Sequence, residues 1–594
     1  MTIESDSVKT HRPPNVSVSE HANALGSVIA PRKTSVQAGM RVLEKGGNAV
    51  DAAVAAALVA GVIEPTETTL AGSGFMLVHS PGEEPWSVDF GPKAPLSATS
   101  TMFDVDPSAS SSAVLGLAPV VDNANVDGAL ASGVPRTLLG LVAAHERFGT
   151  IPLNAVLSPA ITAASAGFRA DSWFLTSALS DLQRLSRDAM SAEIFLDGAG
   201  LPKGHSSGIN YGHSFDTATL IRQELLASTL STVAEKGAAT LIDGEIAQGL
   251  VATSNEMGGI LSMSDLGAAA PEIKPAMTLD YRGHIVAVPP APGGGITELE
   301  ILNIWQALDP RKTRSWESGE SLRALALTMR HAFADRYHWL GDPAVVPVPT
   351  HGLLSAEYGQ AVAMEVLKGT DVARWGDGAP WQTFASTPIH DPWPYSGHED
   401  SRPDWRPWSS TTPTSGTTHI SAVDSAGTAV AITHTAANHF GNGIVCPRTG
   451  LIFDSSMAWF NALPGAANSI TPGGRALANM GPALLSRDGT PIAAVGASGG
   501  RRIISAVAQI IINLIDGGLS LVDSLSRPRI DASGRSLLVH EGCGEKTSSL
   551  TDLGIELVPQ SNEPFTMDFA RPNVAGFDDS GNPASAITSQ HYND

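Results

Sequence analysis

The order of apolar and polar residues along the chain predicts a mixture of strands and helices. Apolar or alternating runs bounded by turn residues predict strands at residues 27–30, 74–80, 85–90, 284–288 and 492–495. Apolar residues spaced three and four apart predict helices at residues 217–235, 297–308, 321–340 and 503–515, the first of them within a mostly helical stretch, 137–265. Residues 49–57 predict a helix of small residues that can pack closely against a sheet.

Two segments follow neither pattern. Residues 106–128 are rich in serine and alanine and predict a loop. Residues 371–416 contain many prolines, no periodicity and five of the eleven tryptophans, Trp375, Trp381, Trp393, Trp405 and Trp408. Because an exposed indole forfeits its burial energy, we expect this second segment to wrap the body of the protein and line a cleft.

At Thr417 the pattern changes abruptly to β. Residues 418–423 and 428–435 are alternating or β-branched runs on either side of Asp424-Ser425-Ala426-Gly427, which is a hairpin signal. If residue 423 pairs with 428, folding back places Thr417 opposite residues 433–435. A one-residue change in register exchanges the two faces of a strand, so either Thr433 or Thr435 comes to lie beside Thr417.

Composition and charge narrow the class of protein. The chain has 594 residues, with 59 glycines, 40 prolines and 42% hydrophobic residues, which is typical of a globular α/β protein with many tight turns. Its formal charge of −22 argues against nucleic acid or an anionic membrane as a partner, because both require a basic surface. Cys446 and Cys543 lie in no metal-type cluster and are interpreted as structural thiols.

The N-terminal residues 1–26 are interpreted as a disordered tail. They are polar and contain no apolar run of the secretory type. The longest apolar run, 49–63, contains Asp51 and is too short to span a bilayer. We therefore expect a cytoplasmic protein.

The Gly416-Thr417 step carries the first candidate chemistry. Glycine offers an unhindered carbonyl, and the threonine hydroxyl can attack it to form an ester whose hydrolysis leaves a new N-terminal threonine. An α-amino group has an ordinary pKa of about 7.7–8, so it can accept the hydroxyl proton near neutral pH. Threonine with its own amine is one form of the nucleophile–base pair.

A second candidate lies at Gly499-Gly500, which follows the strand predicted at 492–495 and precedes a helix. A glycine-rich turn from strand to helix leaves backbone N–H groups directed into a concavity, which is a natural oxyanion site. No lysine of the Walker type follows, so a phosphate site is disfavoured.

Several ordered blocks together resemble the γ-glutamyltransferase family. The block Gly46-Gly47-Asn48-Ala49-Val50-Asp51-Ala52-Ala53 is similar to the family's GGNAxDAA signature, and Thr417-Thr418-His419 to Val423-Asp424 is similar to its processing site and nucleophile block. Further matching blocks are Ser132-Gly133-Val134-Pro135, Pro289-Pro290 with Gly294-Gly295, Ala334-Asp335-Arg336, Leu340-Gly341-Asp342-Pro343, Phe440-Gly441, Gly499-Gly500 and Arg527-Pro528-Arg529.

The resemblance implies an α+β protein with a four-layer αββα sandwich of the N-terminal-nucleophile hydrolase type. It implies one precursor cut between Gly416 and Thr417 into a large subunit, 27–416 after the tail, and a small catalytic subunit, 417–594. The two subunits stay together and can oligomerise further. Thr417 would be nucleophile and base, Thr435 would bind its hydroxyl, and Gly499 and Gly500 would hold the oxyanion. No metal or organic cofactor is implied.

The positions implied to bind the substrate depart from the family pattern. The family's α-carboxylate-binding arginine falls on Gly91, and an asparagine and an aspartate that contact the amino-acid head fall on Ala437 and Trp459. A serine pair falls on Ala478 and Asn479. These five residues cannot pair with a charged zwitterion, and an unpaired buried charge costs several kcal/mol.

The favoured interpretation is therefore a self-processing amidohydrolase or acylase that cleaves a linear small-molecule amide with an acyl group other than γ-glutamyl. One alternative is a γ-glutamyl hydrolase or transferase that holds its substrate through Arg136, Arg448 or Arg501. Another is a processed but inactive binding homologue. The pairs His390-Asp391 and His398-Glu399-Asp400 are interpreted as solvated residues of the Pro/Trp-rich segment.

Overall fold

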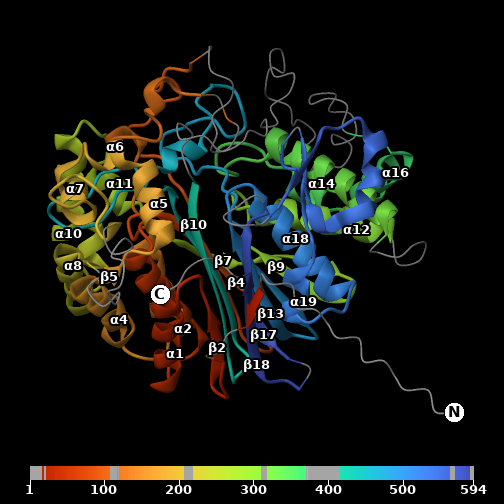
Figure 1. The fold of residues 1–594 in the computed structure, drawn as a ribbon, viewed down its shortest axis with the longest axis horizontal. Helices are drawn as coiled ribbons and strands as arrows, with labels where there is room; N and C mark the ends of the chain where they lie inside the picture. Colours follow the sequence, from red (N-terminus) through yellow and green to blue (C-terminus); the bar gives the residue numbers. More distant parts are fainter. Residues whose placement is uncertain are drawn as a thin grey trace, which may run out of the picture.

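The computed structural model describes residues 16–18, 22–106, 117, 119–205, 219–309, 318–369, 371, 415–534, 536–561, 569–578 and 580–588. Two large sheets lie face to face in its centre (Figure 1). The first has the strand order β2 (Gly26–Ile29), β10 (Ser415–Asp424), β11 (Ala429–Asn438), β3 (Ser73–His79), β4 (Trp86–Phe90), β7 (Glu272–Pro275). The second has the order β1 (Val16–Val18), β18 (Pro583–Thr588), β17 (Arg571–Phe577), β13 (Thr490–Ser498), β12 (Ala483–Arg487), β9 (His284–Val288), β8 (Met277–Tyr281).

Neighbouring strands in both sheets are antiparallel. Small apolar residues fill the space between the sheets, among them Ala431 of β11 and Ala494 of β13. A close approach occurs at Gly496 of β13, because a Cβ atom built there would lie 2.2 Å from Cε1 of His419 on β10. A glycine at this position therefore lets the two sheets meet beside the start of the predicted small subunit.

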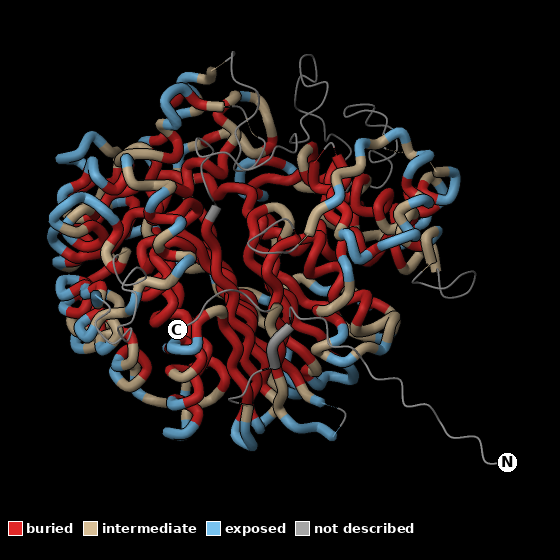
Figure 2. The backbone as a smooth tube through the Cα atoms, in the orientation of Figure 1, coloured by how far each residue is buried: buried red, intermediate tan, exposed pale blue. Residues whose placement is uncertain are grey.

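Helices cover the outer face of each sheet, and the buried part of the chain is concentrated in the sheets and the helix faces against them (Figure 2). On the six-stranded sheet lie α1 (Lys33–Glu44), α2 (Ala49–Ile63), α3 (Thr137–Phe148), α4 (Leu153–Ala166) and α8 (Glu224–Lys236), which share one apolar core with its strands. On the seven-stranded sheet lie α12 (Gly295–Leu308), α14 (Gly319–Trp339), α16 (Ala356–Lys368), α18 (Arg502–Ile515) and α19 (Leu521–Ser526). The order helix, sheet, sheet, helix is the αββα sandwich of an α+β protein.

Smaller elements complete the two sides. On the side of the first sheet these are α5 (Ser172–Ser180), α6 (Leu182–Leu185), α7 (Ala189–Phe195), α9 (Ala239–Ile242), α10 (Glu245–Glu256), α11 (Met263–Gly267), β5 (Phe168–Arg169) and β6 (Leu220–Ile221). The others are α15 (Thr350–Leu353), β14 (Ile530–Asp531), β15 (Leu537–His540), β16 (Leu557–Gln560), and the 3₁₀ helices η1 (Val121–Asn123), η2 (Ala129–Ala131), η5 (Ser456–Trp459) and η6 (Glu541–Leu553). No helix of the described residues is long and apolar enough to cross a bilayer.

Helix α2 shows how the small-residue pattern acts. All fifteen of its residues are buried, as expected for a helix that is apolar all round. Asn48 and Asp51 form a reciprocal capping box at its start. The Ala49 N–H donates to Asp424 Oδ2 at 2.8 Å, so the start of the helix is attached to the turn of the β10–β11 hairpin.

The predicted strands and helices are confirmed, with three corrections. Strand β1 pairs with β18, so Val16–Val18 belongs to a sheet and not to a disordered tail. The helix expected from residue 217 begins at Glu224, because Leu220 and Ile221 form β6 and pair with β5. Residues 121–123 of the expected 106–128 loop form η1. Residues 372–414, including the tryptophans and histidine–acid pairs, lie outside the described residues.

The close contact at Gly496 gives a test of the sandwich. Gly496→Ala should destabilise the protein by about 1–3 kcal/mol, the usual cost of overpacking, because its Cβ would overlap the fully buried His419 ring. Gly198→Ala is the control, since no atom lies within 4 Å of the position that its Cβ would take. Thermal unfolding midpoints measure both; equal midpoints would contradict the close approach of the two sheets.

Candidate active site

A β-bulge places Thr417 at the centre of the site. Gly416 pairs with Ala437 and Thr418 pairs with His434, and the register shifts between them. Two residues of β11 therefore oppose Thr417 alone, which is the arrangement of a bulge. Gly416 is required beside it, because a Cβ there would lie 2.2 Å from the carbonyl oxygen of Thr66.

The hydroxyl groups of Thr417 and Thr435 converge on the carbonyl of Gly416. Thr417 Oγ1 lies 2.7 Å from that carbonyl oxygen and 3.3 Å from Thr435 Oγ1. The Thr435 hydroxyl donates to the same carbonyl oxygen and accepts the Ala437 N–H at 2.8 Å. Of the two threonines that the hairpin could bring to Thr417, the structure therefore selects Thr435.

A buried ion pair holds the backbone nitrogen of Thr417. This N–H donates to Glu67 Oε2 at 3.0 Å, and Arg571 Nη2 donates to the same oxygen at 2.5 Å. Trp173 Nε1 donates to Glu67 Oε1 at 2.7 Å. The Arg571 guanidinium lies 5.5 Å from the centre of the Trp173 ring. The atom that would become the α-amine is thus fixed by a carboxylate whose charge is balanced.

Two histidines near Thr417, the predicted nucleophile, are kept uncharged by burial. Burial, together with the neighbouring His434, lowers the pKa of His419 to about 3, and burial lowers the pKa of His434 to about 3. Because the Ser421 hydroxyl donates to Asn573 Oδ1, it accepts from His419 Nε2 at 2.9 Å, and His419 Nδ1 accepts from Thr433 at 2.8 Å. Asn573 donates back to the His419 carbonyl at 2.7 Å, which ties β10 to β17.

The turn at Gly499 and Gly500 lies at the end of β13, where Ser498 pairs with Arg571. Their φ angles are +136° and +62°, and a Cβ on Gly499 would lie 2.8 Å from Ala570 Cα. Neither N–H group donates to another group of the described chain. The turn thus carries two N–H donors, and it follows the β13 residue, Ser498, that pairs with Arg571 on β17.

Three of the predicted substrate positions lie in one apolar cluster. Ala437, Trp459 and Ala478 belong to it, and its other members include Phe75 and Met480. Ala437 also connects the cluster to the nucleophile, since its N–H donates to the Oγ1 atom of the second threonine. Its φ of +68° is in the left-handed region, which a non-glycine residue adopts only at a cost.

Gly91 lies next to Phe75, a member of this cluster. A Cβ there would lie 2.6 Å from Cζ of Phe75, so no side chain fits at this position without movement of the ring. Asn479 is held differently, because Arg336 Nη2 donates to its Oδ1 at 2.7 Å and to the Ala478 carbonyl at 2.8 Å. Charged side chains border the cluster, since Arg336 binds the Ala478 carbonyl and Arg475, which precedes the cluster member Ala476, pairs with Asp89.

The comparison with protein-family models decides the family. The model of γ-glutamyltranspeptidase matches residues 35–566, which include the nucleophile strand, the glycine turn and the substrate positions. The chain belongs to the γ-glutamyltranspeptidase family.

The relatives of the chain include glutathione hydrolase proenzymes and acylase proenzymes. The chain is 31% identical to a glutathione hydrolase proenzyme of Pseudomonas sp. (strain A14), over 85% of this chain and 81% of that protein. It is 29% identical to an acylase ACY 1 proenzyme of Pseudomonas sp. (strain V22), over 88% of this chain and 85% of that protein. Its fold is similar to the structure of cephalosporin acylase from Bacillus halodurans, with a TM-score of 0.75 and 22% sequence identity. The superposition covers 100% of this chain and 98% of the acylase chain.

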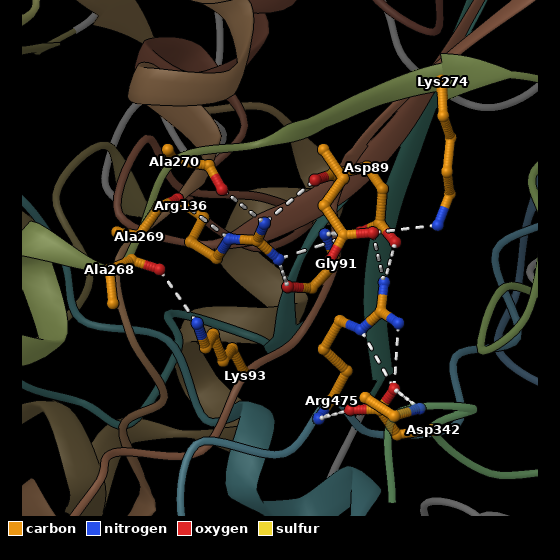
Figure 3. Close-up of polar contacts among 12 residues, drawn as sticks. Asp89, Gly91, Lys93, Arg136, Ala268, Ala269, Ala270, Lys274, Asp342 and Arg475 are labelled. Atoms are coloured by element: carbon orange, nitrogen blue, oxygen red, sulfur yellow. Dashed lines mark hydrogen bonds and ion pairs between the residues drawn. The ribbon is translucent and has the colours of Figure 1, made fainter.

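In this member of the γ-glutamyltranspeptidase family, Arg136 is a structural residue (Figure 3). Its guanidinium donates to the carbonyl oxygens of Gly91, Asp89, Ala269 and Ala270 at 2.7–3.1 Å. The neighbouring Arg475 pairs with Asp89 and Asp342, each at 2.8 Å. The expectation that Arg136 could hold a substrate is therefore wrong, because its donors already bind the protein's own carbonyls.

The other two arginines considered as substrate ligands lie in different surroundings. Arg448 forms a two-bonded pair with Glu256 of α10, and 42% of its side chain is exposed. Arg501 donates to Ser533 at 3.0 Å. Both cysteines are buried free thiols. Within the described ranges, no three His, Cys, Asp or Glu side chains gather as a metal site.

Three residues of the site, Glu67, Trp173 and Arg571, are not among those predicted from the sequence. Glu67 did carry a signal, because it is one of two acidic residues, with Glu64, in the otherwise apolar and Thr/Gly-rich stretch 62–78. A charge that the pattern buries requires a partner. Its partner could not be named from the sequence, since Arg571 lies 504 residues further along the chain.

The hydroxyl geometry predicts self-cleavage before Thr417. Wild-type protein should give two bands on a denaturing gel, the smaller of them residues 417–594. Thr417→Ala should stay as one full-length band, because no hydroxyl remains to attack Gly416. Edman sequencing of the small band gives the cleavage site; an active uncut wild-type chain would exclude the mechanism.

The glycine turn predicts a defect in turnover. Gly500→Val should lower kcat of the mature enzyme about 10²-fold or more, the usual effect of losing an oxyanion donor. Gly518→Val is the matched control. Gly518 has a similar φ of +58°, and no atom lies within 4 Å of its Cβ position. It follows the C-terminal end of α18, whereas Gly500 precedes the N-terminal end of the same helix. If both variants lose the same activity, backbone strain alone explains the result.

Proposed function

We propose that the chain is a self-cleaving N-terminal-threonine amidohydrolase that hydrolyses a linear amide whose acyl group lacks an amino-acid head. The observation that carries this proposal is the contact between the Thr417–Thr435 hydroxyl pair and the apolar side chains of Ala437, Trp459 and Ala478. The hydroxyl pair supplies the chemistry, and the cluster defines the acyl group.

Self-cleavage follows from the order of the hydroxyl contacts. Thr417 Oγ1 attacks the carbonyl carbon of Gly416 and gives its proton to Thr435 Oγ1. Thr435 passes its own proton to the carbonyl oxygen, to which it already donates. The hydroxyl formed on that carbon then re-forms the carbonyl and gives up its proton to the Thr417 nitrogen as the C–N bond breaks, which leaves an ester and a free amine. Water hydrolyses this ester to a Gly416 carboxylate and the Thr417 hydroxyl.

In the mature enzyme the freed amine acts as the base. A lone carboxylate beside it would raise its pKa and keep it protonated. Arg571 lies 2.5 Å from the same Glu67 oxygen and offsets that charge, while His419 and His434 stay neutral. The amine can therefore accept the Thr417 hydroxyl proton near neutral pH as the hydroxyl attacks the substrate carbonyl. The N–H groups of the glycine turn can bind the resulting oxyanion.

The acyl cluster opposes a zwitterionic head group. An α-ammonium and an α-carboxylate would lose water on packing against the alanines, methionines and aromatic rings of this cluster. The alanines, Trp459 and the methionines offer no opposite charge to replace that water, and such a transfer costs several kcal/mol. An apolar acyl chain gains burial in the same place. The second candidate, γ-glutamyl hydrolysis or transfer, is favoured by the 31% identity to a glutathione hydrolase proenzyme.

A substrate panel separates the two candidates. We expect a γ-glutamyl anilide to have a kcat/KM at least about 10²-fold below the best of a glutaryl, an oxamyl and a simple acyl anilide, because polar partners missing from a site lower kcat/KM strongly. Initial rates of the mature enzyme at equal substrate concentrations measure this.

Ala437→Asn is the matched variant for this panel, since asparagine tolerates the left-handed backbone at this position. It should raise the rate on the γ-glutamyl anilide, because its amide offers the head group a polar partner. A wild-type preference for the γ-glutamyl compound by a wide margin would instead establish the second candidate.

A further inference from the structure

The hydroxyl of Ser498 is buried and has no partner among the described residues. Ser498 is the last residue of β13, and it is 1% exposed. Its Oγ atom forms no hydrogen bond within that part of the chain. Most buried polar groups in native proteins are paired, and an unpaired one costs free energy. A free hydroxyl one residue before Gly499 therefore points to a partner that binds there.

The alternation along β13 directs the Ser498 side chain into the space between the two sheets. Successive side chains of a strand point to opposite faces. Ala497 packs in the core that β13 shares with α18, whereas Ala494 packs between the sheets. Gly496 faces the first sheet as well, because a Cβ there would lie 2.2 Å from Cε1 of His419. Ser498 is two residues further along and faces the same way.

Strand β17 shows that Ser498 lies at the level of the nucleophile. Ser498 pairs with Arg571 in the second sheet, and the Arg571 side chain donates to the Thr417 carbonyl oxygen at 3.4 Å. Asn573, two residues along β17, donates to the carbonyl oxygen of His419, two residues along β10, at 2.7 Å. The two sheets are therefore in step, and the position of Ser498 corresponds to that of Thr417.

The Thr417 side chain points into the same space from the first sheet. The Thr433 hydroxyl binds the His419 ring there, and Thr435 lies on the same face of β11 as Thr433. Because Thr417 Oγ1 is 3.3 Å from Thr435 Oγ1, the nucleophile lies on that face too. The hydroxyls of Thr417 and Ser498 therefore face each other across the space between the sheets.

The uncut chain does not use the Ser498 hydroxyl. The carbonyl oxygen of Gly416 accepts from the hydroxyls of Thr417 and Thr435, and Ser498 Oγ is not among its partners. In the mature enzyme the Thr417 hydroxyl attacks a substrate carbonyl instead. A C–O bond forms, the hydroxyl proton goes to the freed amine, and the electron pair of the C=O bond moves to the carbonyl oxygen. This charged oxygen requires hydrogen-bond donors.

We propose that the Ser498 hydroxyl donates a hydrogen bond to this oxyanion, together with the N–H groups of the glycine turn. The inference rests on the proposed function, because it assumes that acyl transfer occurs at Thr417. Ser498 is then a catalytic residue, since it contacts a reacting atom of the substrate. A serine hydroxyl is a suitable donor for such a site, and one donor of this kind accounts for about 10²–10³ in kcat.

Replacement of Ser498 tests the proposal on the anilide that the wild type hydrolyses fastest. Ser498→Ala should lower kcat of the mature enzyme about 10²-fold, equally at every pH, because the lost donor does not titrate. Ser498→Thr keeps the hydroxyl and should recover most of the rate. Ser87→Ala is the matched control and should keep the wild-type kcat. Ser87 of β4 is also buried without a hydroxyl partner among the described residues, but it lies two strands from β11.

Self-cleavage distinguishes a catalytic role of Ser498 from a structural one. Ser498→Ala should be cut before Thr417 at the wild-type rate, because Thr435 and not Ser498 contacts the Gly416 carbonyl. A folding defect would slow cleavage and turnover alike, and that result would overturn the proposal. An unchanged kcat would also overturn it. So would a shifted pH profile with an unchanged plateau, which would make Ser498 a ligand of the Thr417 amine.

Binding of a boronic acid separates this proposal from the proposed function. Pentylboronic acid can add to the Thr417 hydroxyl as a tetrahedral adduct, one of whose oxygens takes the place of the oxyanion. By calorimetry, the mature wild type should bind it about tenfold more tightly than Ser498→Ala does. This difference supports the donor even if no anilide is hydrolysed, whereas equal affinities would exclude it. Hydrolysis of the γ-glutamyl anilide alone would contradict only the proposed acyl group.

Discussion

The site depends on the pairing of β10 with β11 and on the bulge that interrupts it. Regular pairing would commit the Thr417 backbone to the ladder, whereas the bulge leaves its N–H for Glu67 and still places Thr435 beside it. The hairpin lies between β2 and β3 in the sheet, and its turn is attached to the buried helix α2. Because the surrounding strands fix the register, the two hydroxyls and the Gly416 carbonyl meet without a flexible loop.

Charge around the nucleophile is balanced. Glu67 holds the Thr417 nitrogen, Arg571 compensates Glu67, and the two nearby histidines are kept neutral by burial. The Glu67–Arg571 ion pair connects the two sheets, since Arg571 lies on β17 of the second sheet while Glu67 lies in the segment before β3 of the first. Removing either partner would leave the other charge buried and unpaired, which costs roughly 3–5 kcal/mol. The sandwich and the amine site thus depend on the same ion pair.

Recognition of the acyl group is separable from this machinery. Glutathione hydrolase and acylase proenzymes are both relatives of the chain, at 31% and 29% identity. The hydroxyl pair and the glycine turn are positioned by strands β10, β11 and β13, whereas Trp459 and Asn479 lie on η5 and on the segment before β12. The residues proposed to contact the acyl group and those proposed to carry the chemistry therefore lie on different elements.

Local signals along the chain were sufficient to predict the main elements and to single out Thr417 as the candidate nucleophile. The alternating runs around the turn 424–427 specify a hairpin, and the Gly416-Thr417 step at its start specifies where the chemistry can occur. The glycine turn after β13 was equally local. In contrast, the residue pattern left Thr433 and Thr435 both possible, and Thr435 was named only through the family resemblance, since the bulge that sets the register has no signature in the sequence.

The remaining features of the site also arise only on folding. Folding brings Glu67 to Arg571 and occupies the Arg136 donors with carbonyls. Each of these outcomes depends on contacts between residues far apart along the chain. A pattern of neighbouring residues does not encode such contacts, because it specifies which positions are buried and not which groups they meet.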